Sequence, residues 1–152
     1  MTRNFIFVFI LLATLTIINA IPLHKRATSF GPCPNVQDTF TVTMSPDPLI
    51  SPHLTTITIA GEETSGRIIN PLASLVITIG DVVPVQPPSV SPVCNSTDCP
   101  GSKVAQTVTF LLNATLPPSY QIVLSVGNIN TSSPQMEFIN DEILACALAT
   151  VP

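Results

Sequence analysis

Four cysteines are the side chains of this sequence best suited to covalent chemistry. Cys94 and Cys99 are separated by four residues in the stretch PVCNSTDCPGSK, while Cys33 and Cys146 lie far apart. In an oxidising compartment four cysteines indicate two disulfide bonds, and three pairings are open. A metal site at Cys94 and Cys99 is disfavoured because no histidine or third ligand accompanies them. We therefore expect disulfides and no bound metal.

Catalytic chemistry finds little support in the rest of the sequence. His53 is the only histidine after residue 26 and stands in SPHL among turn residues, where a lone histidine is usually only solvated. No Gly-x-Ser-x-Gly nucleophile elbow occurs. The adjacent acids Glu62-Glu63 and Asp141-Glu142 would point to opposite faces of a strand. We expect no enzyme, no catalytic residue and no cofactor.

The first residues are typical of a secretory signal peptide. Arg3 is followed by a continuous apolar stretch from Phe5 to Ile18, and Ala20 is a small residue at a cleavage point. The alternative, a membrane anchor, would need about 20 apolar residues. We therefore predict a signal peptide over 1–20 and a protein that is secreted or lies in the secretory or vacuolar lumen.

Residues 21–26, IPLHKR, end in the basic pair Lys25-Arg26. Secretory proteases often cut after such pairs, so this stretch is either a short pro-segment or an uncut flank. Residues 27–152 then form one domain of ordinary size. Three N-glycosylation sequons fall in this domain and indicate surface positions. They begin at Asn95, Asn113 and Asn130.

The predicted mature domain is acidic. Two strong bases, Arg67 and Lys103, stand against nine acids, which gives a formal charge of −7. Nucleic acid is excluded as a partner because binding it needs clustered Lys and Arg. Electrostatic attachment to anionic membranes is disfavoured for the same reason.

These side chains must be positioned by strands, because apolar and polar residues alternate with period two along most of the domain. The last apolar run carries Cys146, and we prefer a strand to a helix there because the other segments are strands. Proline-rich stretches separate the segments, for example Ser45–Pro52 and Pro84–Pro92. The expected strands cover Phe40–Met44, Thr56–Ala60, Ser74–Gly80, Val104–Asn113, Tyr120–Val126 and Glu142–Ala149. This pattern predicts an all-β fold, an antiparallel β-sandwich of immunoglobulin-like size.

The order of the motifs resembles the secreted ML lipid-recognition family. It covers residues 33–148 and is most similar to the fungal phosphatidylglycerol/phosphatidylinositol transfer proteins, which are related to the Niemann–Pick type C sterol carrier. The most specific parts are Asp47-Pro48, the pair Cys94 and Cys99 with Pro100, the Pro117-Pro118 before Tyr120, and Cys146. The chain departs from the family pattern in SPVC before the first hairpin cysteine, in Pro-Pro-Ser for Pro-Pro-Gly, and in its few lysines.

The resemblance implies two sheets with an apolar cavity between them, and the pairings Cys33–Cys146 and Cys94–Cys99. It implies a monomeric carrier that touches membranes transiently and moves a phospholipid or a sterol in its cavity. Arg67 and Lys103 are the candidates for contact with a phosphate headgroup. The inward-facing residues expected to line the cavity are Val42, Ile57, Ile59, Ile77, Phe110, Leu112, Ile122, Leu124 and Phe138.

A secreted interaction or surface module with a filled core and no lipid is the alternative. Alternation cannot separate the two functions, because the same apolar residues can line a cavity or fill a core.

Overall fold

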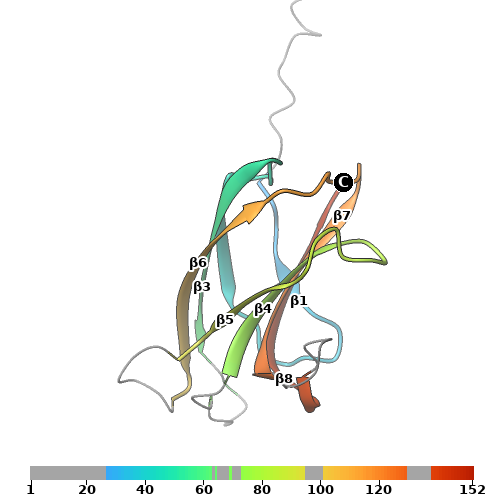
Figure 1. Cartoon of the computed structure of the whole chain (residues 1–152). Helices are drawn as coiled ribbons and strands as arrows, with labels where there is room; N and C mark the ends of the chain where they lie inside the picture. Colours follow the sequence, from blue (N-terminus) through green and yellow to red (C-terminus); the bar gives the residue numbers. More distant parts are fainter. Residues whose placement is uncertain (1–26, 63, 65–68, 70–72, 95–100, 130–137) are drawn as a thin grey trace, which may run out of the picture.

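The computed structural model describes residues 27–62, 64, 69, 73–94, 101–129 and 138–152. These residues form two antiparallel sheets that face each other (Figure 1). The prediction of an all-β sandwich is therefore confirmed. Within these ranges, no helix is long and apolar enough to cross a membrane.

The larger sheet has five strands in the order β1-β8-β7-β4-β5. Its central strands, β8, β7 and β4, pair along most of their length, whereas β1 and β5 are short and lie at the edges. The strands are β1 (Gly31–Pro32), β4 (Ala73–Gly80), β5 (Ser89–Pro92), β7 (Tyr120–Ile129) and β8 (Phe138–Val151).

The smaller sheet has three strands in the order β2-β3-β6. They are β2 (Thr41–Ser45), β3 (His53–Glu62) and β6 (Lys103–Leu112). The middle strand β3 pairs with β6 over its whole length, from His53 opposite Leu112 to Glu62 opposite Lys103.

Two details of the sequence prediction are corrected by this pairing. His53 is not a turn residue, because it begins β3 and pairs with Leu112. The proline-rich stretch Pro84–Pro92 is not only a connector, because β5 occupies its last four residues. Proline is tolerated there since β5 is an edge strand, on which one side needs no backbone donor.

The predicted faces of the strands are confirmed. On β3, Ile57 and Ile59 are fully buried, while the threonines between and beside them lie on the outer face. The final apolar run is the strand β8, whose Ala147 and Ala149 point into the core opposite Leu124 and Ile122. The core is thus the apolar layer that the two inward faces form together.

The disulfide Cys33–Cys146 is confirmed and joins the segment after β1 to β8, across a sequence separation of 113. The same segment is held by the backbone, because the Cys146 amide donates to the Asp38 carbonyl at 3.0 Å. Cys94 is also disulfide-bonded, whereas Cys99 lies outside the described residues. The pairing Cys94–Cys99 therefore remains a prediction.

We expect removal of Cys33–Cys146 to cost more stability than removal of the bridge at Cys94. The double change Cys33→Ser/Cys146→Ser should lower the free energy of unfolding by about 2–5 kcal/mol, because it frees a long loop in the unfolded chain. Urea unfolding of this variant and of Cys94→Ser/Cys99→Ser measures the two costs. An equal loss in both would contradict the expectation, and non-reducing peptide mapping checks the pairings.

A second prediction concerns Thr55, the only fully buried hydroxyl residue among the described ones. Its Oγ1 has no hydrogen-bond partner among the described residues, and a buried unsatisfied polar group is destabilising. Thr55→Val, which keeps the side-chain shape, should therefore raise the free energy of unfolding by about 1–2 kcal/mol.

The matched control for Thr55→Val is Thr58→Val on the outer face of the same strand. The Thr58 hydroxyl is paired with that of Thr107 at 3.0 Å, so this change should not stabilise. Thermal unfolding of both variants gives the comparison. A Thr55→Val variant less stable than the wild type would show that the hydroxyl has a partner in solution.

Candidate functional site

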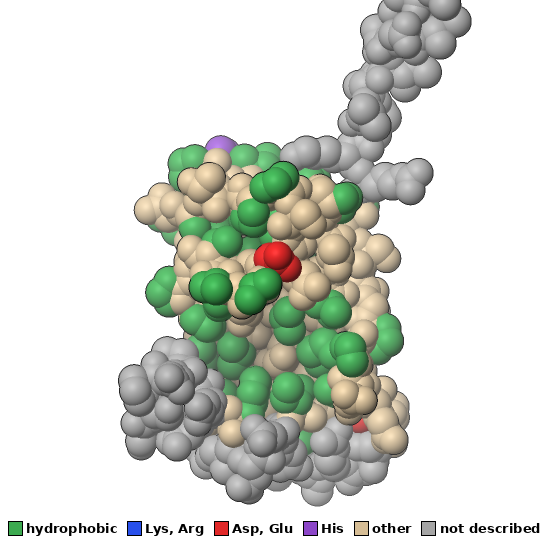
Figure 2. Space-filling view, turned by 90° about the vertical axis from the view of Figure 1, so that its right-hand side faces the viewer, with side chains coloured by type: hydrophobic (Ala, Val, Ile, Leu, Met, Phe, Trp, Pro, Cys, Tyr) green, Lys and Arg blue, Asp and Glu red, His purple; other side chains and the backbone are tan. Residues whose placement is uncertain are grey.

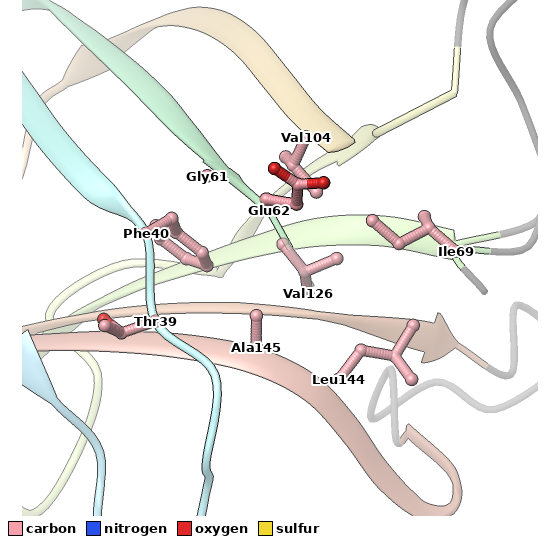
Figure 3. Close-up of a pocket in the computed structure, with 9 residues that line it drawn as sticks. All are labelled: Thr39, Phe40, Gly61, Glu62, Ile69, Val104, Val126, Leu144 and Ala145. Carbon is pink, nitrogen blue, oxygen red and sulfur yellow. The ribbon is translucent and has the colours of Figure 1, made fainter. Parts of the chain in front are cut away.

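A small apolar cavity lies between the two sheets, at the end where β3 finishes and β6 begins. Figure 3 shows side chains from both sheets converging on it. Its volume is about 10 Å³, which is room for about one water molecule. The apolar lining consists of Phe40, Ile69, Val104, Val126, Leu144 and Ala145, with Thr39, Gly61 and Glu62 completing the wall.

A β-bulge places two neighbouring residues of β8 at this cavity. Val126 pairs with Ala145, but the next residue, Gly127, pairs with Ile143, so Leu144 is an extra residue on β8. A bulge bends its strand and redirects a side chain. Leu144 and Ala145 can therefore both line the cavity, although strict alternation would send one of them outward.

On the side of the smaller sheet, Gly61 allows the chain to approach closely. A Cβ built on Gly61 would lie 2.7 Å from the Cβ of Phe40 and 3.3 Å from the Thr39 carbonyl oxygen. The Cα and Cβ of Phe40 therefore lie directly against Gly61, and Phe40 is itself buried. Only glycine gives this room without displacing Phe40.

Hydrogen bonds hold the segment around Asp38 that leads to Phe40. Asp38 is buried, and its Oδ1 accepts from the backbone amide of Thr64 at 3.0 Å and from the Thr64 hydroxyl. Ile69 is held at the other side of the cavity, where its amide donates to the Gly101 carbonyl at 2.8 Å. These bonds tie the segments outside the strands to one another at the cavity.

Among the residues that the structure describes, few polar groups lie near the cavity. Glu62 lies at its rim and accepts a hydrogen bond from the Ser102 hydroxyl at 3.4 Å. Lys103 is exposed and opposite Glu62 in the strand register. On the face shown in Figure 2, hydrophobic and uncharged side chains predominate, and no Lys or Arg appears among the described residues. Such a surface offers little attraction to an anionic membrane.

Eight of the nine residues that we expected to line a cavity belong to the hydrophobic core or pack against it. Val42 and Phe110 are half-buried against the core, and Phe138 is half-buried at the start of β8. The other six are buried: Ile57, Ile59, Ile77, Leu112, Ile122 and Leu124. None of the nine lies on the wall of the 10 Å³ cavity, so their contact with a lipid stays a prediction.

Of the expected headgroup contacts, Lys103 lies at the cavity end of the sandwich, as the first residue of β6. Arg67 lies outside the described residues. Among the sequons, Asn113 is exposed directly after β6, in keeping with a site that could carry a glycan. Asn95 and Asn130 lie outside the described residues.

Some cavity residues could have been found from the sequence and others could not. Phe40, Val104 and Val126 fall on the strand faces that alternation marks as inward, so the signal was present. Leu144 depends on the bulge and Ile69 on an isolated bridge to Gly101, and neither feature follows from a period of two.

The cavity is apolar, and its walls come from both sheets. Within the described ranges, no group of three or more His, Cys, Asp or Glu side chains could hold a metal ion. The walls of the cavity carry aliphatic and aromatic side chains and a single carboxylate at the rim.

No protein-family model and no curated protein matches this sequence. Among solved structures, the chain is similar to chicken MD-1, seen in a crystal structure complexed with lipid IVa, with 12% identity and a TM-score of 0.47. The similarity covers 80% of this chain and 86% of that chain. At this identity and TM-score, nothing about the ligand of this chain follows from the likeness.

We expect Gly61→Ala to be strongly destabilising for a glycine-to-alanine change. The added methyl group would force Phe40 to move, and overpacking of this kind costs about 1–3 kcal/mol. Gly31→Ala in β1 is the control, because a Cβ there meets nothing within 4 Å. Urea unfolding should show a loss for Gly61→Ala only, and equal stabilities would contradict the close contact with Phe40.

Proposed function

We propose that this protein is a secreted lipid carrier of the ML type, which binds the apolar part of one lipid between its two sheets. The observation that carries the proposal is the small apolar cavity at one end of the sandwich, with walls from both sheets. The resemblance of the sequence motifs to the ML family supports the same reading.

An apolar interior suits the energetics of lipid transfer. Each methylene buried from water is worth about 0.8 kcal/mol, so a lipid with two acyl chains cannot leave a membrane for water at a useful rate. Between the sheets the chains would meet residues such as Ile59 and Leu124, which are fully buried. The carrier would work by exchange, since the chains are shielded in both places, and we propose that no side chain acts catalytically.

Binding requires the sandwich to widen. Pockets that enclose small ligands have volumes of about 300–1,000 Å³, far above the 10 Å³ of this cavity. The sheets face each other mainly through side-chain packing, and one cross-link between them is the hydrogen bond from Gln106 Nε2 to Ser91 Oγ at 3.2 Å. Separation of the sheets at this edge would break no strand pairing within either sheet.

The charges near the rim bear on which class of lipid the protein would bind. Lys103 could meet the phosphate of phosphatidylglycerol or phosphatidylinositol, whereas Glu62 at the rim and the net charge oppose an anionic headgroup. A sterol, which carries no charge, avoids that repulsion. Phospholipid and sterol are therefore the two ligand classes to compare.

The alternative function is a secreted interaction module with a filled core. One observation favours it, namely that the cavity between the sheets has room for only about one water molecule. A module of this kind would bind no lipid and would act through its surface.

A transfer assay separates the two functions. Vesicles containing fluorescent phosphatidylinositol, phosphatidylglycerol or a sterol are mixed with acceptor vesicles and the purified protein. We expect the wild type to accelerate transfer of at least one lipid, and Leu144→Trp, which fills the cavity, to reduce that rate at least tenfold. Leu54→Trp is the matched control, because Leu54 is 63% exposed on the outer face of β3.

Circular dichroism and urea unfolding confirm that both tryptophan variants fold, and Val104→Phe replaces Leu144→Trp if the latter does not. Mass spectrometry of an organic extract of the secreted protein is an independent check. Transfer of none of the three lipids together with a lipid-free extract would favour the interaction module. Equal rates for Leu144→Trp and wild type would remove the cavity from the mechanism.

A further inference from the structure

Asp47 holds the first described residues of the chain against the sandwich. Its carboxylate accepts hydrogen bonds from the Thr28 amide at 3.0 and 3.1 Å and from the Thr28 hydroxyl at 2.7 Å. Within the described residues, Thr28 supplies every hydrogen bond that the Asp47 side chain accepts. The exposed Asp47 carboxylate, in the turn between β2 and β3, therefore binds the N-terminal segment.

The sequence places a protease signal directly before this contact. The basic pair Lys25-Arg26 precedes Ala27, and Ala27 precedes Thr28. The nitrogen atoms of Ala27 and Thr28 are separated by three covalent bonds, so they lie within about 4 Å of each other. Any charge on the Ala27 nitrogen would consequently act on the Asp47 carboxylate at short range.

We propose that a protease specific for paired basic residues cleaves the Arg26–Ala27 bond, and that the new α-ammonium of Ala27 pairs with Asp47. Water adds across the peptide bond, leaving a carboxylate on Arg26 and an amine on Ala27 that is protonated at neutral pH. Before cleavage the Ala27 nitrogen is a neutral amide. Cleavage thus adds a positive charge beside a carboxylate that is already oriented toward the N-terminal segment.

The negative charge of Asp47 also acts on Tyr120. Tyr120, the first residue of β7, is buried, and burial raises the pKa of its hydroxyl. The negative charge of Asp47 raises that pKa further. The charge of this exposed carboxylate is therefore felt by a buried side chain at the start of β7.

The pairing would fasten the mature N-terminus to the fold. The segment from Ala27 leads to β1 and then to Cys33, whose disulfide reaches β8. An ion pair at Asp47 would hold the free end of that segment, whereas the disulfide holds its other end. Removal of residues 21–26 would then stabilise the domain.

The first test identifies the N-terminal residue of the secreted protein. N-terminal sequencing of the wild type should give Ala27, and the variant Lys25→Ala/Arg26→Ala should retain a longer N-terminus. A wild-type protein that begins only at Ile21 would overturn the proposal.

The second test measures whether the new terminus interacts with Asp47. Asp47→Asn is made in the processed wild type and in the uncleaved Lys25→Ala/Arg26→Ala variant, and Tm is measured for each. We expect Asp47→Asn to lower Tm by about 2–4 °C more in the processed protein. Asp81→Asn, which removes the same charge at another exposed position, should have equal effects in both. Equal effects for Asp47→Asn would overturn the ion pair.

A third measurement removes the positive charge of the Ala27 α-amine and leaves Asp47 unchanged. Lys103 is the only lysine after residue 26, so in a processed Lys103→Gln protein the α-amine of Ala27 is the only alkyl amine. Acetylation of that amine should lower Tm by a similar amount when Asp47 is present. An unchanged Tm after complete acetylation would contradict the proposal.

Discussion

The structure depends on the burial of two apolar sheet faces against each other. Each strand meets this constraint by alternation, which turns residues such as Ile57 and Ile59 inward and leaves threonines outside. The outer threonines satisfy one another, as in the pairs Thr56–Thr109 at 3.1 Å and Thr58–Thr107 at 3.0 Å. Among the described residues, the buried polar side chains are Asp38, Thr55, Ser74 and Ser125.

The same constraint bears on the proposed function. Sheets held mainly by apolar packing can separate without loss of their own hydrogen bonds, and a lipid chain can replace protein contacts with contacts of the same chemistry. Three inward residues of β8 are small, namely Ala145, Ala147 and Ala149. Large neighbours such as Phe40, Leu124 and Leu144 fill the space beside them. These large side chains would therefore have to move before a lipid chain could enter between the sheets.

Polar and covalent ties are concentrated on the N-terminal segment rather than in the core. Residues 27–38 are held by Asp47, by the disulfide to Cys146 and by the backbone bond at Asp38. This segment contributes only the two-residue strand β1 to the larger sheet, so packing alone would hold it weakly. These ties hold a segment that forms only a short edge strand.

The sequence by itself determined the strand segments, their inward faces and the all-β class, because a period of two is a local property of the chain. Residues such as Ile59 and Leu124 could be placed in the core for that reason, and the disulfide Cys33–Cys146 was predicted from the motif resemblance. Only the tertiary structure decided that β5 lies within a proline-rich stretch, that His53 begins a strand, and that Leu144 enters the cavity through a bulge. These features arise from pairing between strands distant in sequence, and so does the meeting of Gly61 with Phe40. Local periodicity carries no information about such contacts, because they depend on which strand becomes the neighbour and in what register.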